Sequence, residues 1–155
     1  MDKIDKIAIQ QLAEEFIRHW EITPPADLSR VLNILKTEVY DWNMPTQKID
    51  GAHMALKDGT FIIIVNAKSP LVRKRFTIAH EIGHIYLRHY KHLSPSHREA
   101  NIFATELLIP MSYVKKLILE EGRYDIKQLS NYFEVPRQAM EIRVKELGLF
   151  EHIRG

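Results

Sequence analysis

The alternation of apolar and polar positions divides the chain into segments of helical period and segments of strand period. Apolar residues recur every three or four positions in residues 7–20 and 28–35, which predicts two amphipathic helices. Residues 38–42, 52–56 and 60–65 are extended runs instead, and Asp58-Gly59 between the last two predicts a β-hairpin. The last of these runs is apolar at nearly every position, so we expect a well-buried strand.

The helical period returns after Ser69-Pro70 and continues to the end of the chain. A long helix is predicted to about residue 89, followed by a helix from Ser96 to Pro110 and a third that ends at Gly122. In residues 125–148, two short amphipathic helices are separated by a break at Val135-Pro136. Helix, tight turn, helix is the outline of a helix-turn-helix.

Composition limits the class of protein and the kind of metal site. The 155 residues are 45% hydrophobic and 27% charged, as expected of a globular domain, and the net charge of +2 is too small to indicate nucleic acid. Without cysteine, a metal site must use His, Asp, Glu and water. No signal peptide pattern and no membrane-spanning run is present, so we expect a cytoplasmic protein with no membrane partner.

The predicted long helix carries the sequence His80-Glu81-x-x-His84. Two histidines four residues apart project from the same helix face, so both imidazoles can reach one metal ion. Glu81 follows about 100° further around the helix, beside the ion, where a carboxylate can take a proton from water. The motif predicts a zinc site, with one zinc ion per chain, and Glu81 as the catalytic base.

A catalytic zinc needs a third protein ligand. A glycine and a histidine three and six residues after the motif would mark metzincins, but the chain has Leu87 and Tyr90. A glutamate from the next helix is the other standard ligand, and both Glu99 and Glu106 are candidates. Glu99 also fits a capping box, because it lies three residues after Ser96. Spacing alone leaves the choice open.

Three motifs together resemble the ImmA/IrrE family of metallopeptidases. They are Arg75-Phe-Thr-Ile-Ala-His-Glu-Ile-Gly-His84, Glu99-Ala-Asn-Ile-Phe-Ala104 and Glu106-Leu-Leu-Ile-Pro110. Residues 58–66, 129–135 and 143–148 resemble further segments of that family, and Thr105 departs mildly from its usual alanine. The resemblance therefore covers most of the chain.

The resemblance implies an α+β, zincin-like fold: a small, mostly antiparallel sheet packed on the active-site helix, with a C-terminal helix-turn-helix-like segment. It implies His80, His84 and Glu99 as zinc ligands and Glu81 as general base. It also implies a protein substrate, a helix-turn-helix repressor of a phage or mobile element encoded nearby. We expect residues 1–121 to form the metallopeptidase core and residues 122–155 a small helical segment packed on it.

Other polar residues have weaker assignments. Asn101 is a candidate to orient a ligand histidine, and His53 is interpreted as a half-exposed strand histidine. Tyr86, Tyr90, His97 and Tyr113 are candidate donors to the oxyanion of the reaction.

The alternative function is a non-catalytic, metal-stabilised regulator or toxin–antitoxin component that binds protein or DNA. We do not expect DNA binding, because the last helix mixes Arg143 and Lys145 with Glu141 and Glu146.

Overall fold

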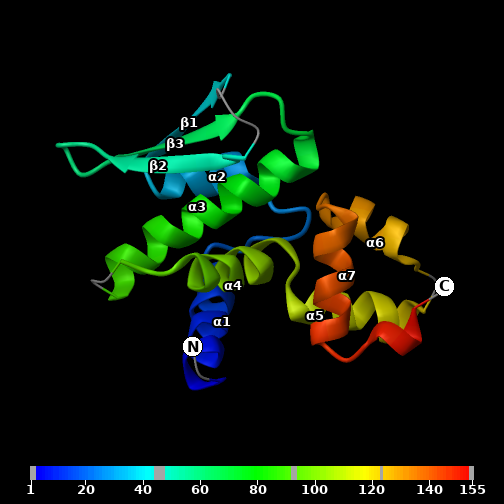
Figure 1. Cartoon of the computed structure of the whole chain (residues 1–155). Helices are drawn as coiled ribbons and strands as arrows, with labels where there is room; N and C mark the ends of the chain where they lie inside the picture. The colour runs from blue at the N-terminus through cyan, green and yellow to red at the C-terminus, as the bar shows by residue number, and fades with distance from the viewer. Residues whose placement is uncertain (1–2, 44–47, 92–93, 123, 154–155) are drawn as a thin grey trace. The chain divides into compact units, whose positions relative to one another are not determined.

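The structure is a computed structural model that describes residues 3–43, 48–91, 94–122 and 124–153. The fold is α+β, as predicted (Figure 1). The chain divides into two compact units, Asp27–Ala104 and Met1–Ala26 with Thr105–Gly155, and each is described by itself. The predicted division into residues 1–121 and 122–155 stays a prediction.

The unit Asp27–Ala104 contains a three-stranded sheet of order β1-β3-β2, formed by β1 (Thr37–Trp42), β2 (Gly51–Ala55) and β3 (Phe61–Asn66). β2 and β3 are antiparallel, which confirms the hairpin at Gly59, where φ is +88°. β1 pairs with β3 in parallel, so the sheet is mixed rather than mostly antiparallel. Only the hairpin has a local turn signal, and for that reason the direction of β1 could not be predicted.

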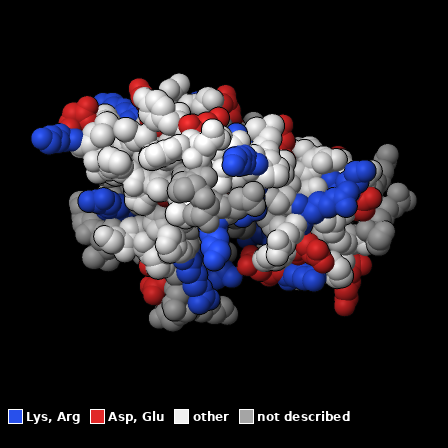
Figure 2. Space-filling view, turned by 45° about the horizontal axis from the view of Figure 1, so that its top comes forward, with Lys and Arg blue, Asp and Glu red and all other residues white. Residues whose placement is uncertain are grey.

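The two faces of this sheet differ in burial. Phe61, Ile63 and Val65 on the inner face are at most 5% exposed, and the register puts His53 beside Ile63 on that face. The outer face carries Tyr40, Trp42 and Met54, each more than half exposed. In Figure 2 the upper part of the surface consists mostly of uncharged side chains, with a few acidic and basic groups among them.

The inner face of the sheet packs on the predicted long helix, α3 (Leu71–Lys91), as Figure 1 shows. The approach is close at Gly51, where a Cβ atom would lie 2.5 Å from Thr77 Cγ2 on α3. The shorter α2 (Leu28–Ile34), capped by the Asp27 side chain, also packs against β1 and α3. β2, and His53 with it, is thereby held against the helix that carries the metal-binding motif.

A second close approach joins α3 to α4 (His97–Leu108). A Cβ atom on Gly83 would lie 2.7 Å from the carbonyl oxygen of Ala100, so only glycine allows this separation. The contact places the first two turns of α4 beside the motif.

The second unit is helical. Its elements are α1 (Lys3–His19), the last residues of α4, α5 (Met111–Lys115), a π-helical turn η1 (Lys116–Glu121), α6 (Ile126–Phe133), α7 (Arg137–Glu146) and a 3-10 turn η2 (Phe150–His152). α6 begins with the predicted capping box, in which Asp125 and Gln128 bond each other's backbone N–H. α6 and α7 pack together and carry buried Leu129, Phe133 and Val144, which confirms the pair of helices expected here.

A buried ion pair joins α4 to α7 within this unit. The Arg143 guanidinium donates to Glu106 Oε2 and, through Nε, to the Ile109 carbonyl oxygen at 3.0 Å. The Met111 N–H donates to the other carboxylate oxygen, Oε1, at 3.1 Å. Both charged residues are only 2% exposed. Burial raises the pKa of the Glu106 carboxyl, and the Arg143 guanidinium and the Met111 N–H act against that rise.

Candidate metal centre and active site

α3 carries the His80-Glu81-x-x-His84 motif, and the polar face of this helix lines a cleft in the unit Asp27–Ala104. His80 and His84 lie one turn apart on α3, with His84 7% exposed, and Glu81 is 5% exposed between them. A buried carboxylate and a buried imidazole on one helix are unusual unless polar partners compensate them. The partners come from α4 and β2.

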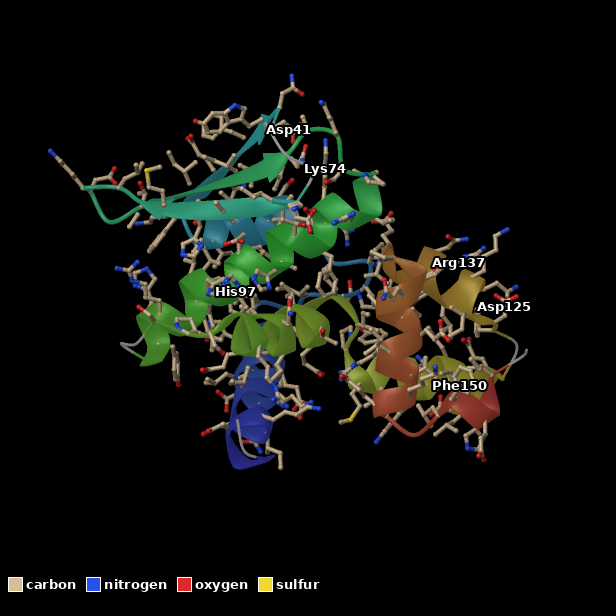
Figure 3. All side chains as sticks on the ribbon, in the orientation of Figure 1. Asp41, Lys74, His97, Asp125, Arg137 and Phe150 are labelled. Carbon is tan, nitrogen blue, oxygen red and sulfur yellow. The ribbon has the colours of Figure 1, made fainter. Side chains whose placement is uncertain are left out.

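Three histidine nitrogens converge at one point. His80 Nε2, His84 Nε2 and His97 Nδ1 are each 3.2 Å from the other two. A tetrahedral zinc site with bonds of about 2.0–2.1 Å separates its nitrogen ligands by roughly 3.3–3.4 Å. The spacing therefore fits a single zinc-sized ion that leaves a fourth position open. In Figure 3, His97 lies between α3 and α4.

Asn101 determines which ring nitrogen of His80 carries the proton. His80 Nδ1 is 2.6 Å from Asn101 Oδ1, and an amide oxygen only accepts hydrogen bonds. His80 therefore carries its proton on Nδ1, and Nε2 offers a lone pair to the point of convergence. Such a partner on the far nitrogen is typical of metal-binding histidines. The orienting role suggested for Asn101 by the sequence agrees with this contact.

The electrostatic surroundings keep His84 neutral. Burial, and after it the electrostatic influence of the neighbouring His80, lowers the pKa of His84 to about 4, whereas Glu81 acts in the opposite direction. At neutral pH the ring is thus unprotonated. A histidine must be in this state to bind a metal ion.

Glu81 is held from β2 by His53. His53 Nδ1 lies 2.5 Å from Glu81 Oε2, and the His53 ring stacks on His84 with centroids 5.1 Å apart. Burial is the largest single influence and raises the pKa of Glu81. The hydrogen bond from His53, and after it the electrostatic interactions with His53, His80 and His84, outweigh the effect of burial, so the pKa lies below its usual range. Glu81 is therefore a carboxylate at neutral pH.

These groups open into a cleft of about 370 Å³ within the same unit. Its lining comes from β2, α3, the segment after α3 and the start of α4: Gly51, Ala52, His53, Glu81, His84, Arg88, Ser94, Pro95 and His97. The base and two of the three converging histidines are thus accessible to a ligand in one depression.

The two candidate third ligands lie elsewhere. Glu99 is in the first turn of α4, where its N–H donates to Ser96 Oγ at 3.2 Å. It follows His97 by two residues, about 200° around the helix, so the two side chains leave α4 in nearly opposite directions. Glu106 is engaged by Arg143 and Met111. Among the described residues, the group able to hold a metal is His80, His84 and His97.

The candidate donors to the oxyanion differ in whether they line the cleft. His97 lines the cleft, whereas Tyr86, Tyr90 and Tyr113 are not among the described lining residues. Tyr86 instead stacks on Tyr90 and makes a tilted ring contact with Phe103.

Sequence reasoning assigned neither His97 as a metal ligand nor His53 as a partner of Glu81, although His53 is a half-exposed strand histidine, as interpreted from the sequence. His97 precedes Asn101 by four residues and so shares its helix face, and this spacing is the signal that could have found it. His53 is in register with buried Ile63, and this register, which the sequence does not show, puts it on the inner face of the sheet.

Comparison with known proteins identifies the family of the chain. Residues 36–145 match the profile of Peptidase_M78, described as an IrrE N-terminal-like domain. The chain belongs to the ImmA/IrrE family. This peptidase family has a metallopeptidase-type function and is zinc-dependent in general, and the three-histidine group of this member is able to bind a metal.

Two further findings accompany the family match. A search of curated proteins gave no match to this ImmA/IrrE family member. None of the helices in the described ranges has the length and apolar character needed to cross a bilayer.

Proposed function

We propose that this protein is a zinc-dependent endopeptidase that cuts a peptide bond in a specific protein. The observation that carries the proposal is the convergence of three histidine nitrogens, each 3.2 Å from the others, beside a buried carboxylate in an open cleft. A purely structural metal site needs no such base.

The proposed ligands are His80, His84 and His97. They would bind one zinc ion per chain. His97 takes the place predicted for Glu99, which in this proposal serves with Ser96 at the start of α4. When bound, zinc would activate a water molecule as nucleophile and polarise the scissile carbonyl. The contact of Asn101 with His80 Nδ1 would keep Nε2 available to a bound metal.

Glu81 takes the proton from the attacking water and delivers it to the leaving amine. The hydrogen bond to His53 occupies Oε2, which leaves Oε1 to receive that proton. His53 also stacks on His84, so one strand residue restrains both the base and a ligand. The proton transfer thus takes place at a carboxylate whose orientation is already set.

The proposed substrate is a helix-turn-helix repressor of a phage or mobile element, encoded near this protein, and the reaction is proposed to occur in the cytoplasm. The resemblance to ImmA/IrrE metallopeptidases supports this choice. Direct DNA binding by α7 is the less favoured role, because Arg143 is buried and Lys145 lies 3.3 Å from Glu141. We therefore favour cleavage of a repressor over direct binding to DNA as the role of this protein.

The test incubates zinc-loaded protein with the repressor encoded by the adjacent gene and identifies cut sites by mass spectrometry. Glu81→Gln keeps size and shape but removes the base, and should retain zinc while slowing cleavage roughly 10²- to 10⁴-fold. The exposed Glu120→Gln is the matched control and should cleave normally. Cleavage by Glu81→Gln at the wild-type rate would falsify the mechanism. Tight binding without cleavage by any form would favour the non-catalytic, metal-stabilised regulator.

A further inference from the structure

Arg88 is a charged residue of the cleft that the proposed chemistry does not use. It follows His84 by four residues on α3, so both side chains leave the same helix face one turn apart. It is exposed, and it lines the cleft together with Ser94. Within the described ranges no carboxylate is paired with its guanidinium.

The charge balance of the cleft favours an anion at this end. Glu81 is the one acidic residue among the described lining, and its Oε2 is already bonded to His53. The three proposed ligands are imidazoles, which leave the two positive charges of a zinc ion uncompensated. Together with Arg88, the cleft therefore carries more positive than negative charge, and a partly enclosed site strengthens its effect on a ligand.

We propose that Arg88 forms a carboxylate-binding subsite of the cleft. A guanidinium matches a carboxylate with two parallel hydrogen bonds, which gives both charge and orientation. Four helical residues rise about 6 Å, and an extended peptide covers that distance in roughly two residues. The bound carboxylate thus belongs to a residue within about three positions of the scissile bond. It is either an Asp or Glu side chain or the C-terminal carboxylate of the substrate.

The inference rests on the proposed peptidase activity, so its test separates binding from cleavage. A peptide library with blocked N-termini is prepared in two forms, with free and with amidated C-termini. Zinc-loaded Glu81→Gln protein, immobilised, captures peptides for mass spectrometry, and zinc-loaded wild-type protein is used in parallel for cut-site mapping. We expect peptides with Asp or Glu at one fixed position to be enriched in both experiments.

Substitution of Arg88 should change this preference without loss of metal. Arg88→Ala should weaken capture and cleavage of acidic peptides by about 10- to 100-fold, the loss expected for a charge-assisted hydrogen bond. Neutral peptides and zinc content should be unaffected. Arg88→Glu should transfer the preference to Lys or Arg at the same position. Arg98→Ala, an exposed arginine outside the described cleft lining, is the matched control.

The outcomes are distinct for the two proposals. A preference that survives amidation identifies an acidic side chain, and one that disappears identifies the chain terminus; both support the subsite. Cleavage with no acidic preference, or with a preference that Arg88→Ala leaves intact, overturns the subsite but not the peptidase. Acidic capture without any cleavage supports the subsite and counts against the peptidase. Neither capture nor cleavage counts against both.

Discussion

The buried pair of Glu106 and Arg143 allows a stability prediction whose magnitude follows from its contacts. Arg143→Met removes the guanidinium but keeps most of the side-chain volume. It leaves the Glu106 carboxyl buried without its cation and the Ile109 carbonyl oxygen without its donor. Removing one partner of a buried pair costs about 3–5 kcal/mol. We therefore expect Arg143→Met to lower the free energy of unfolding by this amount in denaturant titrations.

A second substitution should return part of this loss. Glu106→Gln in the Arg143→Met background removes the uncompensated charge and leaves mainly the unpaired Ile109 carbonyl, which costs about 1–3 kcal/mol. The double variant should thus be more stable than Arg143→Met alone. Lys145→Ala, which breaks the exposed pair with Glu141, is the control and should change stability by less than about 1 kcal/mol.

The loss in Arg143→Met should also depend on pH. Without the cation, burial raises the pKa of Glu106 further above its ordinary 4.5. The native state then holds a proton that the unfolded state releases, so the free energy of unfolding falls as pH rises through that window. The loss should be larger at about pH 8 than at about pH 5. A loss that is below about 1 kcal/mol, or equal in the single and double variants, would refute the reasoning.

Two further predictions concern the metal centre and the helix that carries it. Asn101→Ala removes the acceptor for His80 Nδ1–H and should weaken zinc affinity about 10- to 100-fold in chelator competition, with the fold retained by circular dichroism. Wild-type affinity would mean that Asn101 does not orient the ligand. Gly83→Ala places a methyl group 2.7 Å from the Ala100 carbonyl oxygen and should destabilise the protein by about 1–3 kcal/mol in thermal unfolding. An unchanged midpoint would show that α3 and α4 can separate at no cost.

Sequence reasoning succeeded where the signal was local. The hairpin followed from Asp58-Gly59, the α6 cap from Asp125 and Gln128, and the helical position of His80 and His84 from their spacing. The family followed from motifs that are contiguous in the chain. Each of these features depends on residues a few positions apart, so a single sequence contains enough information to predict it.

The remainder depended on contacts between distant segments. Spacing left both Glu99 and Glu106 as candidates for the third ligand. Nothing local in the sequence indicated that Glu106 pairs with Arg143, 37 residues away. The spacing to Asn101 puts His97 on the same face of α4, but only the close approach of Gly83 to Ala100 brings the start of α4 beside the motif on α3. His53 likewise reaches Glu81 through strand register, over 28 residues of sequence.

The identity of the third ligand tests the central claim most directly. The measurement is zinc per chain, by atomic emission after dialysis, in His97→Ala and Glu99→Ala purified alongside wild type. The three-nitrogen site predicts one zinc in wild type and in Glu99→Ala, and a strong loss of zinc in His97→Ala. Full zinc in His97→Ala with loss in Glu99→Ala would contradict this account and restore a site of two histidines and Glu99.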